Sequence, residues 1–198
     1  MNQEIKCVIL DAQGVTFNAP IIFFLKKIAL ELNFSESYLV DKWHLKYRKL
    51  AWSGNIDDQQ LANELTDGKM SPNEFFEQLE DHFELGPMAP YLEELSSIVP
   101  IYVLSNHRSN WLYQRLKRFN LDKYIKKVFV SEQTGHIKPD HESFKQILDD
   151  SCCLPHQILF LDDQMKNINA ANQLNINSIH VTPDSLRDDL IMYFDLNE

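Results

Sequence analysis

The stretch "VILDAQGVTF" (residues 8–17) places an apolar run directly before a carboxylate, Asp11, and a Gly-Val-Thr turn. Similar short apolar runs recur along the chain: "KCVIL" (6–10), "IYVLS" (101–105), "VFVS" (128–131), "ILFLD" (158–162) and, more weakly, "SIHV" (178–181). Each run is nearly continuous in apolar residues and is bounded by polar or proline residues. This pattern is typical of strands that are buried on both faces of a parallel sheet.

Helical periodicity fills the gaps between the later runs. Three apolar faces are Leu112, Leu116 and Phe119; Phe144, Ile147 and Leu148; and Ile168, Ala171 and Leu174. The alternation of strands and helices over residues 97–194 predicts right-handed crossovers. We therefore expect a three-layer, Rossmann-like α/β fold with a parallel sheet.

About ninety residues between the first two strands carry helical signals and no strand signal. "PIIFFLKKIALEL" (20–32) begins with proline, which favours a helix start. Leu39, Trp43, Tyr47 and Leu50 form a second apolar face, and "SPNEFFEQLEDHF" (71–83) begins with a capping box. We predict a helical cap, residues 17–86, inserted into a core made of residues 1–16 and 87–198.

Aromatic and basic residues of the predicted cap have ordinary structural explanations. Trp43, Trp52, Phe75, Phe76 and Phe83 recur at helical spacing, which favours core packing over substrate stacking. The basic residues His44, Lys46 and Arg48 are read as a solvated helix face.

The composition limits the kinds of molecule that the chain is expected to bind. The 198-residue chain is 44% hydrophobic and has a net charge of −10, which argues against nucleic-acid binding. No apolar stretch reaches the length of a membrane span, and the first residues have no basic signal region. Cys7, Cys152 and Cys153 form neither a metal spacing nor a disulfide framework. We expect a cytoplasmic protein with reduced cysteines.

Polar residues follow the predicted strands. Asp11 ends the first, Ser105 and Asn106 the second, Lys138 follows the third, and Asp162 and Asp163 end the fourth. Because parallel strands place their carboxyl ends at one edge of a sheet, these residues can converge there. Ser105 and Asn106 also suit the N-cap of the helix that follows.

The converging residues suit a hard cation. Asp11 and Asp163 offer oxygen ligands for Mg²⁺, Asp162 can hold a metal-bound water, and Asn167 can orient these groups. Asp11 can then act as a nucleophile on a phosphate, since the cation offsets the repulsion between two anions.

The remaining polar residues suit the phosphate itself. The Ser105 hydroxyl and Asn106 can bind phosphoryl oxygens, and Lys138 can stabilise charge on the nucleophile and the phosphate. His107 and Arg108 come next in the chain and are further candidates for substrate contact.

Four motifs, "DAQGVT", "LSN", "GHIKPD" and "FLDDQMKN", resemble those of the haloacid dehalogenase superfamily in order and in strand context. With the helical insertion, the resemblance covers essentially the whole chain. The stretch from Val103 to Leu148 looks like the branch that includes glucose-1-phosphate phosphatase-like proteins and the N-terminal domain of soluble epoxide hydrolase. The resemblance implies Mg²⁺-dependent hydrolysis of a small phosphorylated metabolite through an aspartyl-phosphate on Asp11.

Gln13 departs from the pattern of the phosphatases in that superfamily, whose first motif is D-x-D. The second Asp there protonates the leaving alkoxide and activates water, and its backbone carbonyl is a metal ligand. Gln13 keeps the carbonyl, but its amide cannot exchange a proton near neutral pH, and losing a general acid–base typically costs ~10²–10⁴ in rate.

Three hypotheses follow: a slow or specialised phosphatase, a non-catalytic protein that binds a phosphorylated ligand, and a dehalogenase. The first is favoured because Asp11, Ser105, Lys138 and Asp163 are all present. Dehalogenases of the superfamily have an aromatic residue at the position of Gln13 and lack the Asp pair. The chain is expected to be a monomer or a homodimer, and no pattern in the cap identifies the substrate.

Overall fold

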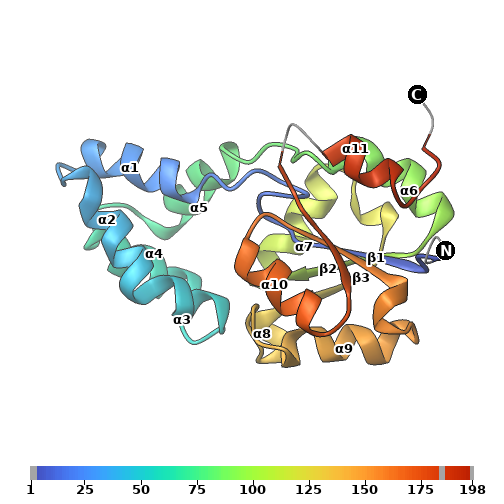
Figure 1. Cartoon of the computed structure of the whole chain (residues 1–198). Coiled ribbons are helices and arrows are strands. Elements are labelled where there is room, and N and C mark those ends of the chain that lie inside the picture. The colour runs from blue at the N-terminus through green and yellow to red at the C-terminus, as the bar shows by residue number, and fades with distance from the viewer. Residues whose placement is uncertain (1–3, 183–185, 197–198) are drawn as a thin grey trace. The chain divides into compact units, whose positions relative to one another are not determined.

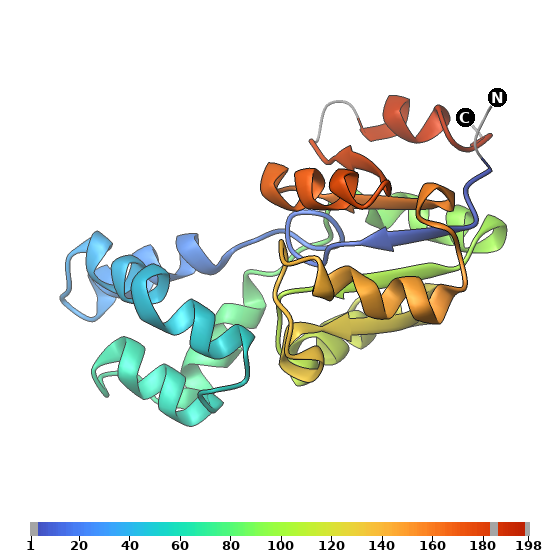
Figure 2. The same ribbon diagram turned by 60° about the horizontal axis from the view of Figure 1, so that its bottom comes forward.

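The computed structural model describes residues 4–182 and 186–196. A five-stranded parallel sheet lies at its centre, with the strand order β3-β2-β1-β4-β5 (Figure 1). The strands are β1 (Cys7–Leu10), β2 (Ile101–Ser105), β3 (Ile125–Val130), β4 (Ile158–Asp162) and β5 (Asn177–His180). The expectation of a parallel α/β sheet is confirmed. Figure 2 shows β1 (blue) between β2 (green) and β4 (orange).

The strand bounds differ from the prediction mainly at β3, which begins at Ile125 instead of residue 128. Its first half contains Lys126 and Lys127, which are exposed because β3 lies at an edge of the sheet. Lysines are common on edge strands, where they discourage pairing with another chain. They also interrupt the apolar run, which is why the sequence pattern detected only the buried half of this strand.

Helices cover both faces of the sheet, as expected for parallel strands. Figure 1 shows α6 and α11 above the sheet and α9 below it. Phe144 and Ile147 of α9 and Ile168 of α10 pack with Ile9 and Phe160 in a buried cluster. The helices of this unit are α6 (Leu92–Ile98), α7 (Ser109–Arg118), α8 (Ser131–Thr134), α9 (Glu142–Ser151), α10 (Met165–Gln173) and α11 (Leu186–Ile191), with 3₁₀ turns at Ala89–Tyr91, Asp122–Tyr124 and Pro155–Gln157.

The contacts divide the chain into two compact units: Met1–Asn18 with Leu85–Glu198, and Ala19–Glu84. The prediction from the sequence placed the boundaries at 16/17 and 86/87, two residues from those in the structure. The expected core also contains residues 1–3, 183–185 and 197–198, which lie outside the described residues. Within the part of the chain that is described, no helix combines the length and the apolar character needed to cross a bilayer.

The second unit is helical and has its own core. Its helices are α1 (Ile21–Glu31), α2 (Glu36–Lys42), a π-helix (Trp43–Tyr47), α3 (Arg48–Trp52), α4 (Asp58–Thr66) and α5 (Pro72–Asp81). Phe24 and Phe75 meet edge to face, with ring centroids 5.1 Å apart. Ser71 accepts a hydrogen bond from the Glu74 backbone, which is the capping contact that the sequence predicts for α5.

The π-helix changes the apolar face that the sequence predicts for this region. Leu39, Trp43 and Tyr47 are buried as expected, but the fourth buried position is Ala51, and Leu50 is only partly buried. A π turn contains more residues than an α turn, so the face after it moves by one position. Regular helical spacing could not reveal this shift.

The chain leaves the first unit after residue 18 and returns to it at residue 85, and the segments next to these two points lie side by side. Phe17 and Leu85 form an antiparallel bridge, and the Gly86 N–H donates to the Thr16 carbonyl over 2.8 Å. A Cβ on Gly86 would lie 2.4 Å from the carbonyl oxygen of Val15, so this approach requires glycine. These contacts therefore fix the loop that follows Asp11.

Candidate active site

Asp11 lies at the carboxyl edge of the sheet, one residue beyond the end of β1. Its N–H donates to the Leu161 carbonyl over 2.9 Å and so extends the ladder between β1 and β4 by one bond. The Ala12 N–H donates to Oδ1 of Asp11 over 2.6 Å, and the Thr16 hydroxyl donates to the Asp11 carbonyl over 2.9 Å. Backbone and turn together fix the position of the carboxylate.

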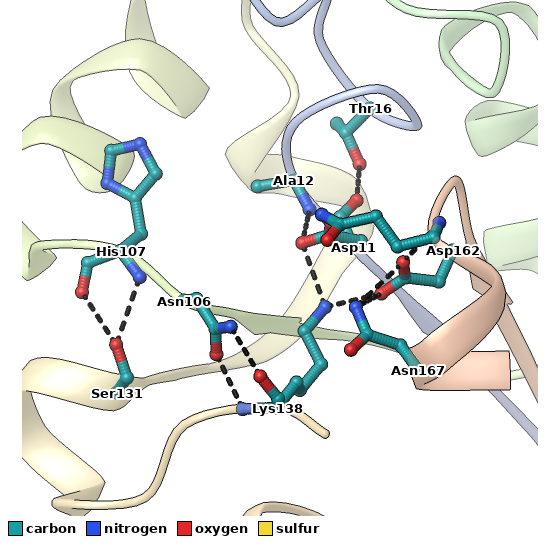
Figure 3. A network of polar contacts seen from close by, with 10 residues as sticks. Asp11, Ala12, Thr16, Asn106, His107, Ser131, Lys138, Asp162 and Asn167 are labelled. Atoms are coloured by element: carbon teal, nitrogen blue, oxygen red, sulfur yellow. Dashed lines mark hydrogen bonds and ion pairs between the residues drawn. The ribbon is translucent and has the colours of Figure 1, made fainter. Parts of the chain in front are cut away.

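Lys138 joins two carboxylates at this edge (Figure 3). Its Nζ lies 3.0 Å from Oδ1 of Asp11 and 2.7 Å from Oδ2 of Asp162. The side chains of Lys138 and Asp162 are 1% and 0% exposed, and that of Asp11 is 7% exposed. The predicted meeting of Asp11, Lys138 and Asp162 is thus present in the structure, as a buried ion-paired cluster.

The pKa values show an excess of negative charge in this cluster. Burial raises the pKa of Asp11 to about 7, and Asp162 and Asp163 add to the rise, although Lys138 opposes it. Burial and Asp162 also raise the pKa of Asp163. Burial lowers the pKa of Lys138, but Asp11 and Asp162 outweigh it and the net shift is upward. One lysine therefore does not offset three carboxylates.

Asp162 is already saturated with hydrogen bonds from the protein. Its Oδ1 accepts from the Gln164 N–H over 2.8 Å, and Asn167 Nδ2 lies 2.9 Å from both of its carboxylate oxygens. With Lys138 on Oδ2, both oxygens are occupied. Asn167 is buried and orients Asp162, so the sequence-based expectation for Asn167 agrees with its position.

Asp163 has a different environment. Its Oδ1 is buried and has no hydrogen-bond partner among residues 4–182 and 186–196. The Oδ1 of Asn167 is likewise buried and has no hydrogen-bond partner in that part of the chain. Carboxylate oxygens of Asp11, Asp162 and Asp163 lie within 4.8 Å of one another, close enough for a single metal ion. An unpartnered buried oxygen beside two further carboxylates suits a hard cation.

Gly14 makes room for Asp163. A Cβ on Gly14 would lie 2.4 Å from Oδ2 of Asp163, and Gly14 has φ +82°, a conformation that favours glycine. From the other side, Nε2 of His180 at the end of β5 donates to the carbonyl oxygen of Asp163 over 2.9 Å. The loop after β1 and the end of β5 thus hold this residue between them.

Ser105 and Asn106 lie at the end of β2, as predicted. Ser105 is the last residue of the strand and is buried. The amide of Asn106 donates to the Lys138 carbonyl over 2.9 Å and accepts from the Lys138 N–H over 2.7 Å. Asn106 therefore positions the backbone that carries Lys138.

His107 is brought to a different place from the cluster. Its ring is buried beside Trp111, and Nε2 accepts from Arg115 over 3.2 Å while Nδ1 donates to the Arg108 carbonyl over 3.1 Å. Burial and Arg115 lower the pKa of His107 to about 3. Figure 3 shows the ring pointing away from Asp11 and Lys138. The structure does not bring this side chain to the predicted substrate.

Arg108 is also engaged elsewhere. Its Nε lies 3.4 Å from Oε1 of Glu132, and its guanidinium lies 5.2 Å from the Trp111 ring. Glu132 in turn accepts from the Ser109 N–H over 2.7 Å at the start of α7. Arg108 thus belongs to a group that fixes this helix start.

Gln13 lies in the loop between Asp11 and Gly14 and is partly buried. It forms a bridge with Phe17, which closes the turn. Three residues near the site were missed by sequence reasoning: Thr16, Gly14 and His180. The glycine in the turn after Asp11 and the polar residue at the end of the fifth strand were the features of the sequence that could have pointed to them.

Comparisons with known proteins identify the family and the fold of the chain. A family model described as "Haloacid dehalogenase-like hydrolase" matches residues 21–181. The match begins after Asp11 and Gln13. A curated D-ribitol-5-phosphate phosphatase from Bacteroides thetaiotaomicron is 28% identical, over 58% of this chain and 68% of the relative.

Solved structures show the same fold. A HAD family enzyme from Bacteroides thetaiotaomicron superposes with a TM-score of 0.74 at 20% identity, covering 95% of this chain and 98% of that one. That enzyme is also known in complex with magnesium and inorganic phosphate. A predicted HAD-like family hydrolase from Porphyromonas gingivalis gives a TM-score of 0.73 at 20% identity, covering 97% and 99%.

Proposed function

The chain belongs to the haloacid dehalogenase-like hydrolase family, and on this premise we propose that it hydrolyses a phosphomonoester of a small metabolite through an aspartyl-phosphate on Asp11. The superfamily predicted from the four motifs is confirmed, whereas the narrower branch stays a prediction. The observation that carries the proposal is the buried Asp11–Lys138–Asp162 cluster with Asp163 beside it. The D-ribitol-5-phosphate phosphatase and the relative that binds magnesium and phosphate support it.

The residues at the site fit Mg²⁺. Oδ1 of Asp163 is buried with no hydrogen-bond partner in the described part of the chain, and burial together with neighbouring carboxylates raises the pKa values of Asp11 and Asp163. Asp11 and Asp163 would hold the cation, with the Gln13 carbonyl as a third ligand. The sequence suggests that Asp162 holds a metal-bound water, but both of its oxygens already accept hydrogen bonds from Gln164, Asn167 and Lys138, so its role is to position Lys138. When bound, Mg²⁺ offsets the charge of the phosphate and of the attacking carboxylate.

The side chains then have distinct roles. The carboxylate of Asp11 attacks phosphorus, and the bond from phosphorus to the ester oxygen breaks, so the leaving alcohol must gain a proton. Lys138 stabilises negative charge on Asp11 and on the phosphoryl group, and Ser105 binds a phosphoryl oxygen. Water then attacks the phosphorus of the aspartyl-phosphate, which releases phosphate and restores Asp11.

Gln13 makes the proton transfers slow. An amide neither donates to the leaving oxygen nor takes a proton from water near neutral pH. The proton for the leaving alkoxide must come from water or from the substrate. This favours substrates whose leaving alcohol has a low pKa.

The direct test is a phosphatase screen with p-nitrophenyl phosphate and sugar phosphates, with and without Mg²⁺. We expect Mg²⁺-dependent turnover that falls at least ~10³-fold in Asp11→Asn, because the nucleophile is lost. Turnover that survives this substitution would exclude Asp11 as the nucleophile. Gln13→Asp should raise turnover by restoring an acid–base group; no gain would show that proton transfer does not limit the rate.

A binding measurement separates the metal site from catalysis. Mg²⁺ at ten times its Kd should stabilise the wild type by about 1.4 kcal/mol in urea unfolding. Asp163→Ala should lose this effect, whereas the exposed control Asp149→Asn should keep it. Binding of Mg²⁺ and phosphate without turnover would favour the non-catalytic hypothesis, and chloride release from 2-chloropropionate would favour the dehalogenase.

A further inference from the structure

A polar cavity of about 760 Å³ lies in the first unit, away from the residues described above. Its polar lining comes from the turn before β4, the end of α10, the start of β5 and the segment after α11: His156, Asn172, Asn175, Asn177, Ser178 and Tyr193. The volume is in the range of sites that bind small molecules.

The cavity belongs to the opposite edge of the sheet from Asp11. It is lined at the beginning of β5 by Asn177 and Ser178, whereas Asp162 and His180 stand at the carboxyl ends of β4 and β5. The first and last residues of a strand of four or five residues lie roughly 10–13 Å apart. A ligand in this cavity would therefore be separate from the phosphate that Asp11 attacks.

The lining is polar but carries no acidic, lysine or arginine side chain among the described residues that form it. An ionic ligand would meet no carboxylate, lysine or arginine side chain of opposite charge among these residues. The cavity therefore favours a neutral ligand.

The amides are held in place by the protein. The Ser178 hydroxyl donates to Oδ1 of Asn172 over 2.7 Å, and the Asn177 amide donates to the His156 carbonyl over 2.6 Å. The first contact leaves Nδ2 of Asn172 as a donor, and the exposed Asn175, whose backbone has φ +60°, adds a further amide. Fixed amide groups lose little conformational entropy on binding.

We infer that this cavity binds a neutral polyhydroxylated ligand, a sugar or a polyol. Each hydroxyl of such a ligand both donates and accepts, which matches the mixed donors and acceptors of amide side chains. The ring of Tyr193 gives the carbon skeleton an apolar surface, and its hydroxyl is another hydrogen-bonding group. The site is independent of the proposed phosphatase activity.

The experiment is an NMR titration of the labelled chain with D-glucose, D-sorbitol and sucrose into the millimolar range. We expect saturable shifts of the Asn177 and Ser178 backbone amides with at least one of these probes. D-gluconate, the charged counterpart of glucose, should bind more weakly. Direct binding is measured because polyols also stabilise proteins by being excluded from their surface.

Two variants test the amides. Asn172→Leu should weaken binding at least about fivefold by removing a hydrogen-bonding group. Asn175→Gly should do the same without straining the backbone, because glycine accepts a positive φ. Asn169→Leu, on the exposed surface of the same helix α10, is the matched control and should bind as the wild type does.

Four results would overturn the inference. They are shifts that rise without saturating for all three probes, shifts centred on Gly14 and Asp163, gluconate that binds as tightly as glucose, and unchanged binding in both variants.

Discussion

Two lysine–carboxylate pairs in this chain have the same separation but lie in different electrostatic environments. In the first unit, Lys138 Nζ lies 2.7 Å from Asp162, and in the second, Lys42 Nζ lies 2.7 Å from Asp67. The first pair is fully buried, whereas the side chains of Lys42 and Asp67 are 20% and 43% exposed.

The carboxylates respond in opposite ways. Hydrogen bonds from Lys42 and Tyr38 lower the pKa of Asp67. Burial raises the pKa of Asp11 to about 7 even though Lys138 is 3.0 Å away. An ion pair at the surface thus stabilises the charged form of its carboxylate, whereas burial in the Asp11–Lys138–Asp162 cluster disfavours the charged form, and a bound cation would offset this. Burial, more than distance, distinguishes the catalytic candidate from a surface contact.

The largest expected effect comes from breaking the buried cluster. Lys138→Met should lower the free energy of unfolding by about 3–5 kcal/mol at neutral pH, because Asp11 and Asp162 would lose their buried counter-charge. Urea unfolding without divalent cations measures the change. A loss below about 1 kcal/mol would show that this cluster behaves like a surface pair.

The next effect concerns a buried group that must stay neutral. The pKa of His107 is about 3 in the fold, against an ordinary value near 6.5. Below pH 6.5 the unfolded chain takes up a proton at this histidine and the fold does not, so stability falls from pH 6.5 towards pH 3 and is unaffected above. At pH 5 the loss is about 2 kcal/mol.

The difference in unfolding free energy between pH 7.5 and pH 5 measures this loss. His107→Leu should reduce that difference by about 2 kcal/mol relative to the wild type. The exposed His156→Gln is the control and should leave it unchanged. Equal pH dependence in the wild type and His107→Leu would contradict the prediction.

A smaller effect is expected from filling the space beside Asp163. Gly14→Ala should cost about 1–2 kcal/mol, since alanine is strained at positive φ. Its Cβ would also displace the Asp163 carboxylate, so Mg²⁺ should stabilise this variant much less than the wild type. Gly68→Ala, which has φ +71° and no neighbour within 4 Å of the added Cβ, controls for the backbone strain alone.

The smallest effect should come from the exposed cluster. Lys42→Met is expected to cost under about 1 kcal/mol, because water replaces the lost contacts of Asp67. A cost equal to that of Lys138→Met in the same urea experiment would remove the distinction between the two clusters.

The strand runs, the helical faces and the order of the motifs were readable from the sequence, because local apolar patterns reflect burial. The structure confirms the predicted parallel sheet, and the matching family model confirms the superfamily. The first half of β3 and the shift from Leu50 to Ala51 were not readable, since both depend on edge position or on a π turn.

The features of the site also fall into two groups, those that the sequence predicts and those that depend on the tertiary structure. The sequence by itself determined which carboxylates and which hydroxyl stand at strand ends, because a strand end is a local property; Lys138 lies farther along the chain, in the loop between α8 and α9. Only the tertiary structure decided that Asn106 holds the Lys138 backbone, that Asp162 is saturated, and that His107 is turned towards Arg115. These facts depend on side-chain direction and on contacts between distant segments, which no local pattern encodes.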